Sequence, residues 1–252
     1  MQIKQSIDKS FHVIHLFVLG LSLFATISAW YYVQEQNEQK VIRQFNREAD
    51  QTVDLIIERL KKYEEALWAG VALFKASDEV NFQEWKKFVE TFNIGQRYKG
   101  INGIGVILNI QKNDIKSLEK RIRKDQPKFK VYPEHNNKYY LPITYIEPLE
   151  QNFKAHGLDI AHEKNRLEAA LKSKETKLAQ ITGPIVLVQD SEKTPGFLFY
   201  APFFDQETFK GMVYAPFVFK RLMAGLLDRN NRHLSLQIFD GEDVLYLSLI
   251  HI

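Results

Sequence analysis

The sequence has no cysteine among its 252 residues. This absence excludes disulfide-stabilised scaffolds, thiolate nucleophiles, and zinc or iron–sulfur sites with cysteine ligands. An excess of one charge is missing too, since 34 Lys and Arg against 31 Asp and Glu leave a formal charge of +3. A nucleic-acid-binding domain concentrates basic charge on one face, so we expect no nucleic-acid partner.

The motifs of common catalytic classes are also absent. The sequence contains no GxxxxGK[ST], GxGxxG, HExxH or GxSxG pattern. One group of possible metal ligands occurs at His156, Asp159, His162 and Glu163, but the two histidines are six residues apart, which suits one helical face poorly. We therefore expect no catalytic residue, no metal and no other cofactor, and predict that the chain is not an enzyme.

What the sequence does contain is a long apolar run near its start. From Phe11 to Val33 there is no Asp, Glu, Lys or Arg, and a helix of that length rises about 34 Å, enough to cross a hydrocarbon core about 30 Å thick. A cleaved signal peptide is the alternative, but its apolar region would be only about 7–15 residues long. We predict a transmembrane helix at residues 11–33, with residues 1–10 in the cytoplasm.

Residues 34–76 contain no proline, and their apolar residues recur every three or four positions. This spacing predicts a stalk helix with one apolar stripe, close to a heptad repeat. Near the membrane, the stripe has two possible partners: its copy in a homodimer, or its own domain. From Leu60 onward, where Trp68 and Phe74 widen the stripe, packing on its own domain is favoured.

The rest of the chain predicts an α+β fold. Strands are expected at residues 101–110, 128–132, 139–146, 180–189, 196–204, 210–217, 234–239 and 244–249. Helices are expected at residues 114–125, 161–174 and 218–227, and a short one that Ser77 caps carries Phe82, Trp85, Phe88 and Phe92. Because the helices do not alternate regularly with the strands, we predict mostly antiparallel pairing.

Several segments together resemble the CHASE domain, the extracytoplasmic sensory module of bacterial receptors and plant cytokinin receptors. They span about residues 65–225 in the order expected for that family, and they are Tyr98-x-Gly100-Ile-x-Gly103-Ile-Gly105, Tyr145-Ile-Glu147-Pro148, Gly157-Leu-Asp159, Glu163-x-x-Arg166, Thr182-Gly183-Pro184, Gly196-Phe-Leu-Phe-Tyr-Ala-Pro202 and Gly211-x-Val-Tyr214-Ala-Pro216-Phe217. The combination is specific, although any one segment alone is weak.

The resemblance implies two PAS-like antiparallel lobes after the stalk: a membrane-distal ligand-binding lobe at residues 77–208 and a membrane-proximal lobe at residues 209–252, which we expect to be incomplete. It also implies a second membrane helix and a cytoplasmic histidine kinase or diguanylate cyclase, expected outside this sequence. Residues 34–252 would lie on the periplasmic side of a bacterial inner membrane. There they would bind a small molecule and pass the signal through a dimeric stalk.

The resemblance further implies the ligand-binding residues, which are Thr182, Val188, Tyr200, Arg166 and Tyr145. Plant receptors carry an acidic residue at the position of Arg166, where it reads the adenine ring of the hormone. Arginine reverses that charge, which argues against a cytokinin and favours an anion such as a carboxylate. The alternative for Arg166 is a salt bridge to Glu163 or Asp159, and the alternative for Thr182 is a bond to the backbone alone.

We therefore predict a membrane-anchored sensor for an organic acid, an amino acid or a purine-like compound. Two other functions remain open: a ligand-free degenerate sensor that acts as an anchored interaction module and, less favoured, a secreted hydrolase.

Overall fold

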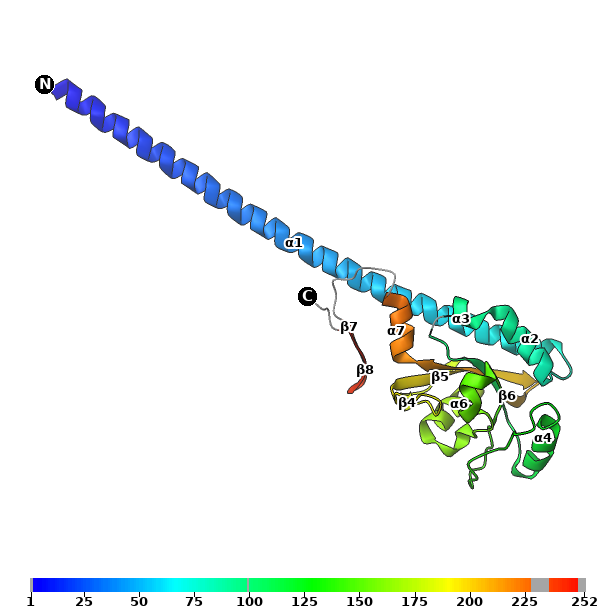
Figure 1. The fold of residues 1–252 in the computed structure, drawn as a ribbon. Helices are drawn as coiled ribbons and strands as arrows, with labels where there is room; N and C mark the ends of the chain where they lie inside the picture. Colours follow the sequence, from blue (N-terminus) through cyan, green and yellow to red (C-terminus); the bar gives the residue numbers. More distant parts are fainter. Residues whose placement is uncertain (1, 99, 228–235, 249–252) are drawn as a thin grey trace. The chain divides into compact units, whose positions relative to one another are not determined.

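The computed structural model describes residues 2–98, 100–227 and 236–248, and the chain divides into two units, Met1–Asp54 and Leu55–Ile252. Helix α1 (Gln2–Ala76) is one continuous helix (Figure 1). The first proline of the chain is Pro127, so nothing in α1 removes a backbone donor from the helix. The helical stretches predicted at residues 11–33 and 34–76 are confirmed as parts of α1.

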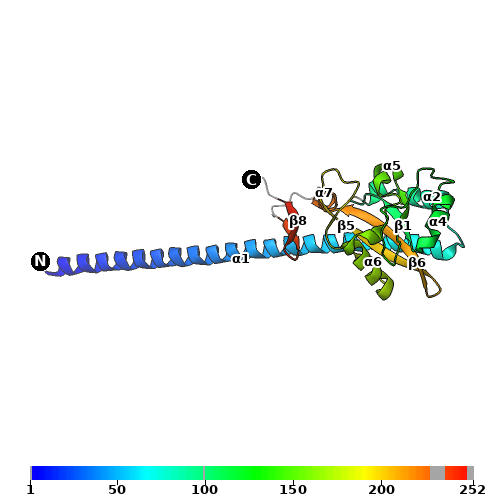
Figure 2. The same ribbon diagram turned by 90° about the horizontal axis from the view of Figure 1, so that it is seen from below.

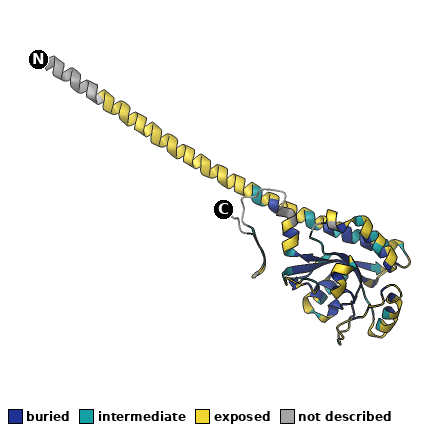
Figure 3. Ribbon diagram, viewed as in Figure 1, coloured by how far each residue is buried: buried dark blue, intermediate teal, exposed yellow. Residues whose placement is uncertain are grey.

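Among the described residues, one helix is long and apolar enough to cross a membrane, the part of α1 that begins at Ile14. Its large apolar side chains are exposed from Ile14 to Val33 (Figure 3). A continuous exposed apolar surface of this kind is stable in contact with lipid rather than with water.

The second unit is built around a six-stranded sheet in the order β2-β1-β6-β5-β3, with β4 also pairing with β5. All its strand pairs are antiparallel, which confirms the predicted α+β class. The strands are β1 (Ile104–Leu108), β2 (Ile143–Glu147), β3 (Gln180–Ile181), β4 (Ile185–Val186), β5 (Pro195–Asp205) and β6 (Thr208–Val218). A separate two-stranded sheet consists of β7 (Leu236–Asp240) and β8 (Asp243–Ser248).

The helices after α1 are short. They are α2 (Phe82–Phe92), α3 (Ile94–Arg97), α4 (Ile115–Ile122), α5 (Leu149–Asn152), α6 (Lys164–Thr176) and α7 (Phe219–Leu227), with 3-10 turns η1 (Lys112–Asp114), η2 (Phe153–Ala155) and η3 (Ile160–His162). Within the second unit, the end of α1 together with α2 lies on one face of the sheet and α6 on the other (Figures 1 and 2).

Both faces of the sheet are buried, because side chains along β5 alternate between two apolar clusters. Phe197 and Phe199 join the cluster that contains the end of α1, whereas Leu198 and Tyr200 join the cluster beneath α6. Helix α1 approaches the sheet closely at Gly70, where a Cβ atom would lie 2.9 Å from Val213 Cγ1.

The apolar stripe of α1 has two environments. Tyr63, Leu67 and Val71 are buried in the cluster on the sheet, which confirms self-packing from Leu60 onward. Ile42 and Phe45, farther toward the N-terminus, are 52% and 55% exposed.

Four details correct the sequence-based prediction. The boundary predicted between residues 208 and 209 falls at the start of β6, which pairs with β5 along its length, so β6 belongs to the first lobe. Residues 128–132 form no strand, because only Tyr132 makes a bridge, to Leu158. The strand predicted at residues 180–189 is broken into β3 and β4, and between them Pro184 lacks a backbone donor.

The fourth correction concerns the cap of α2. Asn81, not Ser77, caps the helix, through a capping box with Glu84. The predicted strand ends at residues 234–235 and 249 lie outside the described residues.

Candidate functional site

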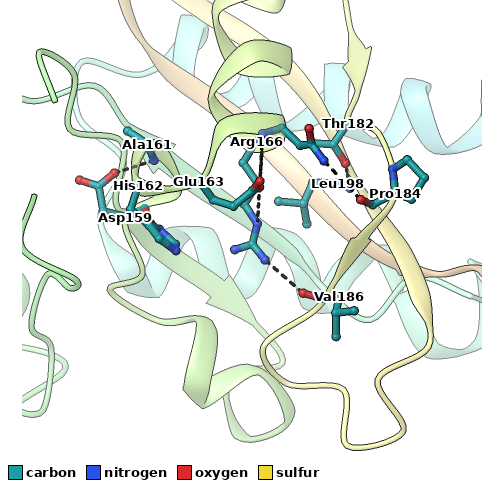
Figure 4. A network of polar contacts seen from close by, with 10 residues as sticks. Asp159, Ala161, His162, Glu163, Arg166, Thr182, Pro184, Val186 and Leu198 are labelled. Atoms are coloured by element: carbon teal, nitrogen blue, oxygen red, sulfur yellow. Dashed lines mark hydrogen bonds and ion pairs between the residues drawn. The ribbon is translucent and has the colours of Figure 1, made fainter.

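The candidate site begins at the first turn of α6, where Glu163 caps the helix by accepting hydrogen bonds from the backbone of Asn165 and Arg166. The Arg166 side chain then points between α6 and the sheet, and the residue is 6% exposed. Its Nη2 donates to Val186 O at 3.2 Å, and its Nε lies 3.6 Å from Glu163 Oε2 (Figure 4). Arg166 therefore forms an ion pair with Glu163, whereas Asp159 bonds elsewhere.

Two tyrosines lie on the same face of the sheet. Tyr200 on β5 is directly opposite Tyr214 on β6, and both belong to the cluster beneath α6. The Tyr214 ring fits because Gly105 on β1 has no side chain: a Cβ atom there would lie 2.4 Å from Tyr214 Cε1. The sheet therefore fixes the Tyr214 ring in place.

Neither hydroxyl has a hydrogen-bond partner among the described residues. Burial raises the pKa of both phenols far above the usual range; the nearby Arg166 opposes this effect, and Tyr200 adds to it at Tyr214. Both tyrosines therefore remain neutral hydrogen-bond donors. A buried unpaired hydroxyl costs about 1–3 kcal/mol, so a pair of them calls for an explanation.

Arg166, Val188 and Tyr214 line one cavity of about 10 Å3, here named the Arg166 cavity. This volume accommodates about one water molecule. The neighbouring Gln189 has its own partner, since its Nε2 donates to Asn152 Oδ1 at 2.9 Å. The cavity thus combines one guanidinium and an unpaired phenol with a mostly apolar wall.

A model of the CHASE domain family matches residues 78–246. The chain belongs to the CHASE domain family. It therefore contains an extracytoplasmic sensing domain. No curated protein matches the chain.

Among solved structures, the chain is similar to an extracellular ligand binding receptor from Desulfohalobium retbaense DSM5692, at 15% identity and a TM-score of 0.41. The match covers 69% of this chain and 26% of the receptor, so this chain spans about a quarter of that protein's length.

The CHASE domain brings only some of the predicted site residues to the cavity. Arg166 and Val188 line it, and Tyr200 lies in the same cluster. Thr182 Oγ1 accepts a hydrogen bond from Leu198 N at 3.0 Å (Figure 4), so the alternative that it bonds the backbone is confirmed. Thr182 instead lines a second cavity, of about 150 Å3.

Tyr145 requires a correction, because it lies on the opposite face of the sheet. Its ring packs against Phe82 of α2 with centroids 6.0 Å apart, and its hydroxyl donates to Val80 O at 3.4 Å. Tyr145 belongs to the cluster that contains α1, whereas the next residue, Ile146, belongs to the cluster beneath α6. The structure therefore does not bring Tyr145 to the Arg166 cavity.

The sequence prediction missed Tyr214 as a site residue. It belongs to one of the segments that resemble the CHASE family, but its importance depends on its place opposite Tyr200. The possible metal ligands near residue 160 are dispersed, since His156 Nε2 faces Thr144 O and His162 Nδ1 faces Asp159 O. Within the described residues, no group of three such side chains is placed to hold a metal ion.

His156 in this domain makes stability depend on pH. Burial lowers its pKa to about 4, a change that the hydrogen bond to Thr144 O only partly opposes. Below pH about 6.5 the unfolded chain binds a proton at this residue and the folded chain does not, so stability is lost as pH falls toward 4. We expect a loss of about 3 kcal/mol from this group.

The measurement is the free energy of unfolding at several pH values between 7 and 4, for the wild type and for His156→Leu. The wild type should lose more stability over this range than the variant does. Parallel curves for the two proteins would contradict the assignment.

Proposed function

We propose that the chain is the sensing part of a membrane-anchored receptor that binds a small organic anion in the Arg166 cavity. The observation that carries this proposal is that Arg166 lines the cavity together with an unpaired phenol. The Tyr214 hydroxyl has no hydrogen-bond partner among the described residues, and neither does the Tyr200 hydroxyl in the same cluster. Arg166 Nε makes no hydrogen bond in that part of the chain, only the ion pair with Glu163. A guanidinium and a phenol donate strongly to a carboxylate. An organic acid fits this set better than a neutral purine does.

The charge near Arg166 supports the same conclusion. Its one ion-pair partner in the described part of the chain is Glu163, at 3.6 Å, and the Glu163 side chain is 35% exposed. Solvent weakens an ion pair of this kind. A ligand carboxylate in the buried cavity would complete the neutralisation of Arg166.

The size of the cavity implies a conformational step. About 10 Å3 admits no organic acid, so the wall that includes Leu187 and Val188 must move when the ligand binds. Only a ligand that binds one arrangement better than the other can shift the balance between them. The sensor would transmit this difference in affinity as a change of conformation.

We place residues 34–252 on the periplasmic side of a bacterial inner membrane and residues 1–10 in the cytoplasm. The stalk would pair with a second copy through the exposed part of its stripe, at Ile42, Phe45 and Val53, since such spacing suits a coiled coil. The output would be a cytoplasmic histidine kinase or diguanylate cyclase, and residues after β6 would begin a second PAS-like lobe.

The test is thermal unfolding of the full chain in neutral phosphatidylcholine nanodiscs, with panels of organic acids, amino acids and purines. An organic acid at about one hundred times its Kd should add about 2.7 kcal/mol of stability, which raises Tm by about 5–10 °C. Arg166→Gln should abolish this increase. Arg121→Gln is the matched control, because Arg121 forms an exposed pair with Glu79.

Tyr214→Phe provides a second variant in which folding is preserved. Its hydroxyl has no partner in the described part of the free protein, so its removal should leave basal stability unchanged or higher. Affinity for the organic acid should fall about tenfold, or 1.4 kcal/mol. The proposal fails if a neutral purine stabilises the wild type and both Arg166→Gln and Tyr214→Phe to the same extent.

A further inference from the structure

An open groove of about 440 Å3 lies beside the Arg166 cavity, and Val188 lines both. Three lysines, Lys128, Lys130 and Lys154, surround it together with the rings of Tyr132 and Phe153; we name it the basic groove. Its volume falls in the range of about 300–1,000 Å3 found for small-molecule sites. It is therefore large enough for an organic ligand, unlike the Arg166 cavity.

The backbone around the groove is firmly held. Tyr132 N donates to Gly157 O at 2.9 Å, and Asp159 N donates to Tyr132 O at 2.6 Å. The Tyr132 hydroxyl also donates to Lys154 O. These bonds join the segment that carries Lys128 and Lys130 to the segment that carries Lys154, so the three cations are gathered by the fold.

The three lysines of the groove form no ion pair among those found in the described residues, and no Asp or Glu lines the groove in that part of the chain. His156 at its floor adds no charge at neutral pH, since burial lowers its pKa to about 4. Three uncompensated ammonium groups attract an anion.

The groove also offers aromatic surface. Phe153 is 52% exposed and Tyr132 is 36% exposed, and Lys128 Nζ lies 6.0 Å from the centroid of the Phe153 ring. Exposed rings beside cations suit a ligand that is planar at one end and negatively charged at the other. An aliphatic acid would leave these rings without a partner.

We infer that the basic groove binds an aromatic carboxylate, with the ring on Tyr132 and Phe153 and the carboxylate among the three lysines. The inference rests on the proposed function only in that the domain is a sensor of organic anions, and it assigns a second anion site beside the Arg166 cavity. Val188 lines both the groove and the Arg166 cavity, so a ligand held in the groove is next to the wall that must move.

The experiment measures binding of benzoate to the full chain in phosphatidylcholine nanodiscs by saturation-transfer NMR, with benzamide as the uncharged probe of the same shape. Benzoate should bind about tenfold more tightly than benzamide. The triple variant Lys128→Gln, Lys130→Gln and Lys154→Gln should weaken benzoate binding about tenfold. Phe153→Leu should weaken both probes several-fold, because it removes ring contact and leaves the charge unchanged.

The matched control is the triple variant Lys87→Gln, Lys120→Gln and Lys172→Gln, which removes the same charge from exposed lysines outside the groove. It should change benzoate binding less than twofold. Equal losses in the two triple variants, equal binding of the two probes, or no saturable binding of benzoate at millimolar concentration would each overturn the inference. If polyphosphate binds more tightly than benzoate, and the groove variant loses that binding, the inference of a small-molecule ligand is wrong.

The same variants separate this inference from the proposed function. If a ligand loses its stabilising effect in Arg166→Gln but keeps it in the groove variant, the inference about the groove is wrong and the proposed role of the Arg166 cavity is supported. If only the groove variant loses binding, the groove stands and the role of Arg166 is wrong.

Discussion

Asp159→Ala is expected to lower the free energy of unfolding by about 3–5 kcal/mol, because it removes one partner from a buried group of polar contacts. Asp159 is 0% exposed. Its Oδ1 accepts from Leu141 N at 3.0 Å and from Ala161 N at 2.9 Å, and its Oδ2 lies 3.2 Å from His135 Nε2. Alanine would leave two backbone donors and an imidazole without an acceptor.

The measurement is unfolding of the full chain in nanodiscs, monitored by near-ultraviolet circular dichroism, since the signal of α1 dominates the far ultraviolet. Asp159→Asn keeps one oxygen acceptor and should show an intermediate loss. Glu207→Ala is the control, because its pair with Lys177 is exposed and such pairs contribute about 0–1 kcal/mol. A loss at Asp159→Ala no larger than in this control would show that the carboxylate does not support the fold.

Trp85→Ala is expected to destabilise the domain by about 3–5 kcal/mol, through lost burial and a cavity. Trp85 is 0% exposed, and its ring lies between Phe74 and Phe88, with centroid distances of 5.9 and 5.3 Å. It packs where α1 approaches the sheet, since a Cβ atom at Gly70 would be 3.3 Å from the Trp85 ring. Few neighbours can move to fill the space, because α1, α2 and the sheet all meet there.

Trp68→Ala is the matched control for this prediction. Trp68 is only partly buried, and its Nε1 donates to Glu64 Oε1 on the same helix, so its loss should cost less than half as much. The loss of stability in Trp85→Phe should lie between the losses in Trp68→Ala and Trp85→Ala. This variant retains an aromatic ring and removes an indole donor that has no partner among the described residues. Equal losses for Trp68→Ala and Trp85→Ala would contradict the assigned packing.

The role of Asp159 shows how far family resemblance predicts a site. Gly157 and Asp159 belong to one of the segments that identify the family, yet both serve the fold. Gly157 has φ of 86°, and a Cβ atom there would lie 2.0 Å from Lys130 O. A segment can therefore be typical of a family because it allows a close backbone contact in the fold, and not because it contacts a ligand.

Tyr145 shows a second limit of the resemblance. The resemblance identified the residue but not the face of the sheet on which its side chain lies. Tyr145 lies on β2 at the edge of the sheet and Tyr200 lies on β5, and the first faces α2 whereas the second faces α6. Side-chain alternation fixes which neighbours along one strand share a face. It does not relate two strands until their pairing register is known, and β1 and β2 have a register shift between Val106 and Ile107, next to Tyr145.

The sequence by itself determined the long helix, the antiparallel α+β class, the CHASE family and the absence of common catalytic motifs. The helix, the fold class and the missing motifs follow from composition, periodicity and local spacing, whereas the family follows from the resemblance of several short segments in their expected order. Only the tertiary structure decided that Arg166 pairs with Glu163, that Tyr214 stands opposite Tyr200, and that three lysines from two segments border one groove. Such placements depend on strand register and on contacts between residues far apart in the chain, and no local pattern contains that information.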